Sequence, residues 1–269
     1  MVQTGPFRLY RRYISISIQA QMQYRASYIM QTVGHFLITA FEFVAIWALF
    51  QRFGSLQGWS LPEVALFYGL ISVAFSINDA LTRGFDIVHR LIKDGTFDRI
   101  LLRPRSTILQ LMGYEFTLKR FGRFAQGVLI ATLGAVNLGI SWHVGKVLLV
   151  LWAVIGGGCL FVGTILIQAT VAFWTTESLE IMNTLTYGGI ETAQYPMTIY
   201  PPWFRKFFTF VVPLACVNYF PLLTVLDKTD PLGSPTWLQP LTPVAGVLFL
   251  CFGLLFWRFG LKHYSSTGS

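Results

Sequence analysis

The feature that most constrains this chain is an uncharged apolar stretch at residues 147–174. It is longer than the roughly 20 residues that a helix needs to cross a membrane. Only 12% of all residues are charged, whereas soluble domains have about a quarter. We therefore predict an all-α integral membrane protein and exclude a soluble enzyme. Including this stretch, seven apolar segments recur along the chain, at 28–50, 64–81, 124–140, 147–174, 181–199, 207–226 and 241–257.

The segment at 207–226 differs from the others because it contains two prolines, Pro213 and Pro221. Proline removes a helical hydrogen bond, so a segment broken twice fits a re-entrant hairpin buried in protein better than a straight span. We therefore predict six transmembrane helices, with this hairpin between the fifth and the sixth. The transmembrane domain covers 28–263 and leaves a short tail at 264–269.

The distribution of Lys and Arg sets the expected orientation. With six spans, one side carries fifteen of these residues and the other carries five, namely Arg52, Lys146, Arg205, Lys206 and Lys228. Positive residues concentrate on the cytoplasmic side, so both termini and the loop 82–123 are expected there. A seventh full span would give fourteen against six, so charge alone favours six spans only slightly. The net charge of +8 then needs no nucleic-acid partner.

The N-terminal region 1–27 predicts an interfacial helix on the cytoplasmic side. Over 7–27, apolar residues recur at three- and four-residue steps while Arg8, Arg12 and Gln19 follow another face. Such a basic amphipathic helix lies in the lipid headgroup region.

The loop 82–107 contains a second, shorter amphipathic helix. Phe85, Val88 and Leu91 share one face, and Gly95 is a residue type that ends helices. Pro104 prevents the helix from continuing. Two interpretations stay open from the residues alone: an interfacial helix that touches anionic lipid, or a docking element for a cytosolic partner.

Two stretches resemble the ABC transporter type-2 permease family. KDGTFDRILLRPRS at 93–106 is similar to the family's Gly-x-x-Asp and Leu-Leu-x-Pro pattern after a short coupling helix. YPMTIYPPWFRKFFTFVVPLACVNYFP at 195–221 is similar to its pattern after the fifth span. The resemblance covers nearly the whole chain, and the branch of daunorubicin- and viologen-exporter permeases is the closest group.

This resemblance implies a transmembrane subunit of an ABC exporter in the plasma or inner membrane. A second permease subunit would pair with it, and a cytosolic ATPase dimer that binds ATP and magnesium would dock beneath. The coupling helix would be 86–94. The expected coupling residues are Asp86, His89, Arg90, Lys93, Asp94, Gly95, Asp98, Arg103 and Pro104.

The chain itself is expected to bind no nucleotide or other cofactor. Its nearest approach to a P-loop, GISWHVGKV at 139–147, has glycine spacing one residue too long and Val147 where a hydroxyl residue is required. His35, His89, His143 and His263 are too dispersed for a metal site, and we expect none.

Polar residues within the spans are candidates for a substrate path, because ionisable groups in a membrane are costly. The alternative is hydrogen bonding between helices or subunits. The transported molecule would be a hydrophobic drug, an organic cation or a lipid-like molecule. A lipid-modifying enzyme and a proton-coupled secondary transporter would use the same carboxylates, so both remain alternatives. The candidates are Glu42, His35, Asp79, Glu191, Gln194 and Tyr187.

Overall fold

The computed structural model describes residues 5–175 and 179–265. Apart from an isolated bridge between Leu56 and Trp59, the regular structure of these residues is helical. The elements are α1 (Pro6–Met22), α2 (Arg25–Phe53), α3 (Leu61–Asp86), α4 (Val88–Lys93), α5 (Phe97–Leu101), α6 (Thr107–Met112), η1 (Leu118–Arg120), α7 (Phe121–Asn137), α8 (Val144–Val171), α9 (Leu179–Ala193), η2 (Met197–Ile199), α10 (Pro202–Lys206), η3 (Phe207–Val211), η4 (Ala215–Tyr219), α11 (Phe220–Val225), η5 (Gln239–Leu241) and α12 (Val244–Lys262).

Four helices in the described residues are long and apolar enough to cross a membrane: α2, α3, α8 and α12. The expected fifth span is shorter than predicted, because α9 has 15 residues, whereas α7 has the predicted 17 residues but begins and ends three residues earlier than the expected third span. Gly139, with a φ of 60°, follows the end of α7, and Pro196 disfavours helix continuation beyond α9. The six predicted spans are therefore not confirmed by helix length.

The segment predicted as a hairpin is a bent pair of helices. The pair consists of 202–211 and 215–225, and its two parts meet at 82° around Pro213. The bend makes the pair either a re-entrant element or a broken span. The predicted second break, at Pro221, is wrong, because the helical part 215–225 continues through this residue. Pro221 lies in the first turn of α11, where proline is tolerated because its missing amide proton is not needed there.

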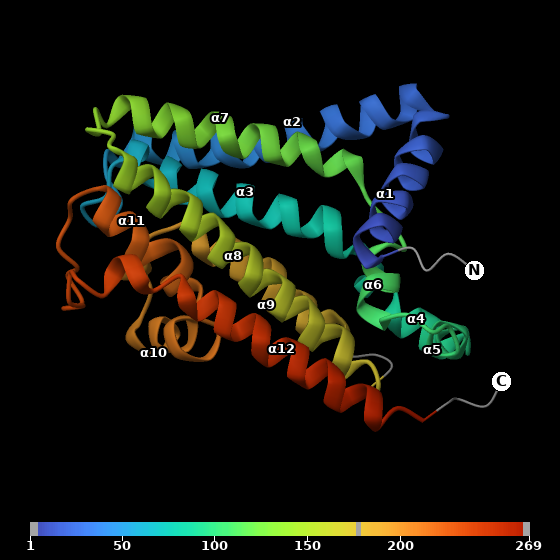
Figure 1. Cartoon of the computed structure of the whole chain (residues 1–269). Coiled ribbons are helices and arrows are strands. Elements are labelled where there is room, and N and C mark those ends of the chain that lie inside the picture. The colour runs from blue at the N-terminus through green and yellow to red at the C-terminus, as the bar shows by residue number, and fades with distance from the viewer. Residues whose placement is uncertain (1–4, 176–178, 266–269) are drawn as a thin grey trace.

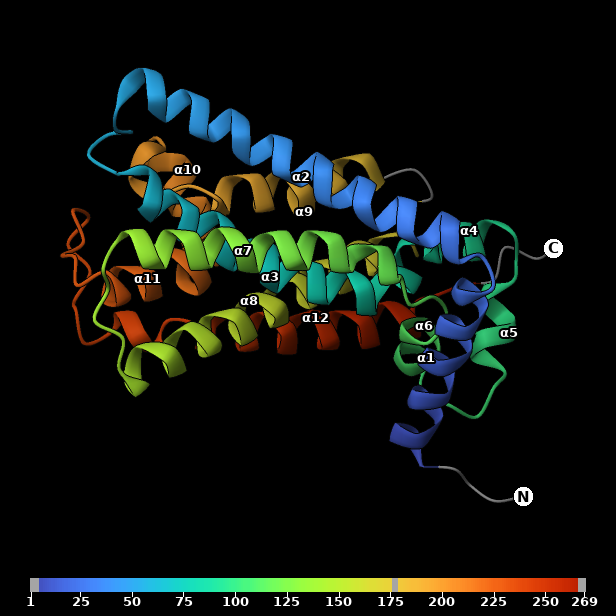
Figure 2. The ribbon, with the colours of Figure 1, turned by 90° about the horizontal axis from the view of Figure 1, so that it is seen from above.

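The N-terminal amphipathic helix is also shorter than predicted. It ends at Met22, and residues 25–27 already form the first turn of α2. In Figures 1 and 2, α1 lies at the same end of the bundle as α4, α5, α6 and the C-terminal end of α12. We call this end the short-helix end. The opposite end carries the connections after α2, after α7 and after α11.

The helices α8 and α12 pack side by side along a seam of glycines (Figure 1). A Cβ atom on Gly246 would overlap the carbonyl oxygen of Gly156, and one on Gly253 would lie 2.9 Å from that of Gly163. In each helix the second glycine follows the first by seven residues, which is about two turns. The two backbones therefore touch over two turns. Small residues permit such approach in membranes, where water provides little force between helices.

Helix α3 occupies the centre of the bundle and packs closely on α7. A Cβ atom on Gly69 would lie 2.6 Å from Ala131 and from the carbonyl oxygen of Gly127. About four-fifths of the most apolar stretch of α3 is buried inside the protein, whereas only about a fifth of the corresponding stretch of α2 is. Among the four long helices, α3 is therefore the innermost and α2 the outermost.

Two ion pairs fix the end opposite the short helices. Lys146 at the start of α8 lies 2.5 Å from Asp227, and Glu63 at the start of α3 lies 2.5 Å from Lys228. Because Asp227 and Lys228 are neighbours after α11, they join the bent helix pair to two spans. The Lys228 ammonium also lies 4.4 Å from the centre of the Trp59 ring.

The glycine seam predicts that Gly246→Ala destabilises the fold while Gly158→Ala does not. A methyl group at Gly246 would force α8 and α12 apart, at a typical cost of about 1–3 kcal/mol for overpacking. A Cβ atom on Gly158 would meet nothing within 4 Å. Thermal unfolding of the purified protein in detergent measures the difference. Equal midpoints for the two variants would contradict the seam.

Candidate coupling surface and intramembrane polar residues

The short-helix end is built from the segment between α3 and α7. The helix predicted over 86–94 begins two residues later, as α4, because Asp86 still belongs to the last turn of α3. Gly95 follows α4 with a φ of 64°, a backbone conformation that favours glycine. This turn lets α5 fold back, and the non-helical stretch at 102–106 that includes Pro104 separates α5 from α6.

Phe97 anchors α5 to the spans through an aromatic cluster. It is fully buried, and its ring centre lies 5.4 Å from that of Phe173 after α8 and 6.5 Å from that of Trp257 in α12. Phe85 of α3 contacts the same Trp257 ring at 5.6 Å. The Trp257 indole N–H also donates to the Thr107 hydroxyl of α6 at 3.1 Å. Four elements of the bundle therefore meet at one side chain.

Asp98 belongs to this anchor rather than to the surface. The Tyr264 hydroxyl, just after α12, donates to its Oδ1 at 2.9 Å, and the Tyr264 ring lies 5.2 Å from that of Phe97. Burial and the neighbouring Asp98 carboxylate raise the pKa of Tyr264 to about 12. The phenol therefore stays protonated and able to donate across the physiological pH range.

Three further predicted coupling residues are also partly buried. Asp86 forms an ion pair with Arg83 at 2.6 Å, and the His89 Nδ1 lies 2.9 Å from the backbone carbonyl oxygen of Asp86. Gly95 supplies the turn. Their positions fit a structural role that holds α4 in place.

The remaining predicted coupling residues lie on the solvent side. Arg90, Lys93, Asp94, Arg103 and Pro104 are exposed. The structure adds others that the sequence analysis did not select, of which Leu102 is the most exposed apolar residue at 84%. The Leu-Leu pair in the family pattern was the available signal for it. We define the exposed basic surface as Arg90, Lys93, Asp94, Arg99, Leu101, Leu102, Arg103, Pro104 and Arg105.

Asp79 in α3 is paired with a cation. Its Oδ2 lies 2.7 Å from Nε of Arg120, and both side chains are largely buried. The adjacent Asn78 is buried too, and neither atom of its amide has a hydrogen-bond partner among the described residues. The ion pair joins α3 to η1, so this candidate path residue fixes the start of α7.

Glu42 and His35 lie on α2, the helix with the least burial. The Glu42 side chain is exposed and contacts the Tyr68 hydroxyl of α3 at 3.4 Å. The same hydroxyl donates to the Thr39 carbonyl at 3.0 Å, and the Gln126 amide of α7 reaches that carbonyl at 3.2 Å. This network ties α2, α3 and α7 together and leaves the Glu42 carboxylate at its edge.

The candidates on and beside α9 also include both exposed and buried residues. Glu191 and Tyr187 are exposed, one turn apart, whereas Gln194 is buried beyond the end of the helix. The Tyr187 ring packs on Phe75 of α3 at 5.9 Å. Exposed carboxylates therefore occur on α2 and α9, while the polar groups of α3 and Gln194 lie inside.

Comparison with known protein families matches residues 36–268 to the ABC-2 family transporter proteins. Because this match covers most of the chain, the protein belongs to that family, and the resemblance seen in the sequence is confirmed. Comparisons with curated proteins and with solved structures found no match.

The buried ion pair predicts a strong effect of Arg120→Gln on stability. The substitution leaves the Asp79 carboxylate buried without its cation, which typically costs about 3–5 kcal/mol. The double variant Asp79→Asn/Arg120→Gln removes both charges and should recover most of the loss. Arg258→Gln, at an exposed position of α12, is the matched control and should unfold like the unmodified protein. Thermal unfolding in detergent measures the stability of each variant. A double variant whose loss of stability equals the sum of the losses of the two single variants would contradict a paired interaction.

Proposed function

We propose that this ABC-2 family protein is the transmembrane permease subunit of an ATP-driven exporter, with the short-helix end in the cytoplasm. A separate ATPase dimer would bind ATP and magnesium and dock on the exposed basic surface. The observation that carries the proposal is the aromatic cluster at Phe97 and Trp257, because it joins that surface to three spans.

Charge supports the proposed orientation. The arginine and lysine residues of 83–123 and of α1 gather at the short-helix end, and positive residues concentrate on the cytoplasmic side. Six spans complete this topology if α7 and α9 cross as short spans and the bent pair is re-entrant. With η1 in front of it, α7 has continuous helix over 118–137, which approaches the usual length of a span.

Coupling follows from how the surface is attached. A force on α4 or α5 would reach Phe97, which is packed between the end of α8 and α12. Close-packed protein interiors have low compressibility and transmit displacement instead of absorbing it. Movement of the ATPase dimer would therefore tilt α8 and α12 together, because their backbones touch along the glycine seam.

A second permease subunit would complete the translocation path. The exposed apolar face of α2, with Phe41, Val44 and Trp47, offers a large surface for lipid or for such a subunit. Glu42 and Glu191 would face the path from α2 and α9. Carboxylates at these positions favour a hydrophobic substrate that carries a cationic group.

The proposal differs from its alternatives in what drives turnover. A lipid-modifying enzyme would act without ATP, and a proton-coupled transporter would work without an ATPase partner. Transport that requires both the partner and ATP excludes the two alternatives.

Leu102→Glu is predicted to weaken binding of the ATPase partner. Leu102 is the most exposed apolar side chain of the surface, and burying a charge in its place would cost about 2 kcal/mol or more, roughly thirtyfold in affinity. Leu102→Met is the matched control. Co-purification of the tagged chain with its ATPase measures binding. Deleting 86–94 would also remove the buried Val88 and Ile92, and Asp98→Arg would break the Tyr264 contact. Leu102→Glu changes the surface without disturbing these buried contacts. Unchanged co-purification of Leu102→Glu would reject the docking assignment.

Glu42→Gln and Glu191→Gln are predicted to lower export of a cationic substrate about tenfold, the effect of losing one charged contact in the path. Export of a neutral analogue should change little, and assembly with the ATPase should be intact. Transport into inverted membrane vesicles measures both substrates. Export of the cation at the unmodified rate in both variants would remove these carboxylates from the path.

A further inference from the structure

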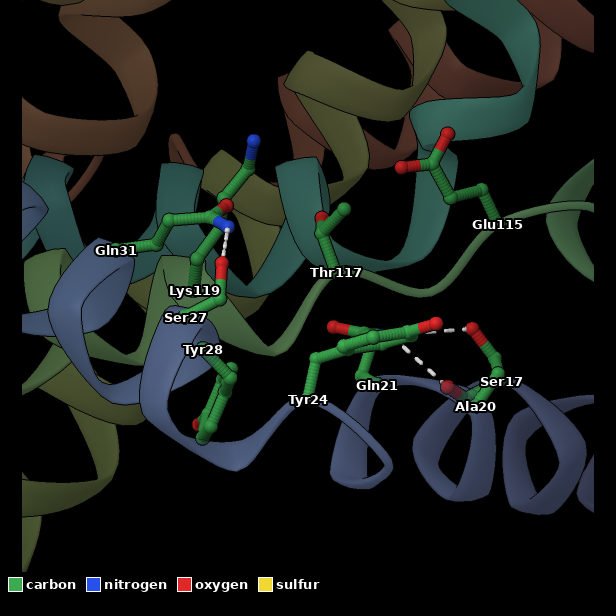
Figure 3. A pocket seen from close by; sticks show the side chains of 10 residues that line it. All are labelled: Ser17, Ala20, Gln21, Tyr24, Ser27, Tyr28, Gln31, Glu115, Thr117 and Lys119. Carbon is green, nitrogen blue, oxygen red and sulfur yellow. Dashed lines mark hydrogen bonds between the residues drawn. The ribbon is translucent and has the colours of Figure 1, made fainter.

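An open cavity, lined mainly by residues whose side chains carry polar groups, lies at the elbow between α1 and α2. Its volume is about 460 Å³, within the range of small-molecule sites. One wall is the C-terminal half of α1, another is the first turns of α2, and the third is the segment 115–119, which runs into η1 (Figure 3). The lining residues are Ser17, Ala20, Gln21, Tyr24, Ser27, Tyr28, Gln31, Glu115, Thr117 and Lys119.

The cavity walls are held in place by hydrogen bonds between α1 and the segment 115–119. The Ser17 hydroxyl and the Gln21 amide both donate to the Phe116 carbonyl, at 3.1 and 2.5 Å. The Leu118 amide donates to Gln21 Oε1 at 3.1 Å. These contacts, about 95 residues apart in the chain, preform the site without a ligand.

Thr117 shows that the cavity is built for a polar ligand. Its side chain is 96% buried, and its hydroxyl has no hydrogen-bond partner among the described residues. A buried hydroxyl without a partner costs free energy, so it normally has one. Figure 3 shows this side chain between those of Glu115 and Lys119. A ligand in the cavity would supply the missing partner once the Thr117 side chain turns toward it, because the hydroxyl oxygen exposes less than 1 Å² as it stands.

The charges of the cavity select the ligand. Lys119 and Glu115 both line it, and neither belongs to an ion pair of the described residues. Lys119 attracts an anionic group, and the start of α2, which has no side-chain cap, adds amide groups and the positive end of a helix dipole. Glu115 attracts a cation. The Tyr24 and Tyr28 rings offer further surface for a cationic group.

We propose that this cavity binds the headgroup of a zwitterionic phospholipid that carries a phosphate and a primary ammonium group. Lys119, the Thr117 hydroxyl and the α2 amides hold the phosphate, and Glu115 holds the ammonium. An anionic headgroup without the amine would lie beside the Glu115 carboxylate without offering it a cation. A trimethylated amine would lack the N–H donors that a carboxylate accepts.

The surroundings favour a membrane lipid over a soluble phosphate ester. The face of α2 that lines the cavity through Tyr24, Tyr28 and Gln31 continues to Ile38, which is 59% exposed. Acyl chains would lie against this face while the headgroup fills the cavity. Bound lipid would brace the elbow, because it would touch α1, α2 and the segment that leads from the short helices into α7.

The test measures lipid binding to the full-length protein as it purifies from the membrane, by native mass spectrometry in detergent. Phosphatidylethanolamine and phosphatidylglycerol with identical acyl chains are titrated separately. Phosphatidylethanolamine should bind about tenfold more tightly, which corresponds to one charge-assisted contact. Soluble glycerophosphoethanolamine should compete only at far higher concentration. Competition at the same concentration would overturn the assignment to a lipid.

Variants locate the binding in this cavity. Thr117→Val and Lys119→Gln should each weaken phosphatidylethanolamine binding about tenfold, and Glu115→Gln should abolish the preference over phosphatidylglycerol. Thr117→Ser keeps the hydroxyl, and Lys262→Gln removes an exposed charge at the same end, so both should bind like the unmodified protein. Thermal unfolding without added lipid checks that each variant is folded. Equal binding of the two lipids by the unmodified protein, or unchanged binding in folded Thr117→Val and Lys119→Gln, would overturn the proposal.

Discussion

Direct contact between helix backbones is the constraint on which the rest of this structure depends. Hydrocarbon gives no hydrophobic force between spans, so they associate by close packing. In α8 and α12 this packing requires Gly246 and Gly253 to touch Gly156 and Gly163, and in α3 and α7 it requires Gly69. These seams set the positions of the spans, and every site described above is attached to them.

The aromatic cluster extends this order from the membrane to the short-helix end. Trp257 and Phe173 are carried by the paired helices, and they enclose Phe97 of α5. Buried aromatic and hydrogen-bonded groups fix the segment, while arginine, lysine and leucine side chains face outward, where the proposed ATPase would dock. The lipid cavity lies on the next part of the same segment, so occupancy there would restrict its movement.

Local patterns in the sequence were enough to predict the helical membrane class, the bend at Pro213 and the turn at Gly95, because each depends on neighbouring residues. Helix ends were less predictable, because α7 and α9 end before the apolar segments that suggested them do. Pairings between distant residues could not be predicted. Nothing in the sequence shows that Arg120 meets Asp79, or that Tyr264 reaches Asp98, since these contacts depend on how the spans pack. The same holds for the wall of the lipid cavity.

Photo-crosslinking to the ATPase tests the central claim most directly, because it reports both the docking surface and the orientation. A photoreactive amino acid is placed at Leu102 on the short-helix end or at Trp237, which is 70% exposed and follows the bent pair at the opposite end. In cells that contain the ATPase partner, the account predicts a crosslink from position 102 and none from position 237. A crosslink from 237, or its absence from 102 in a folded and assembled protein, would contradict the account.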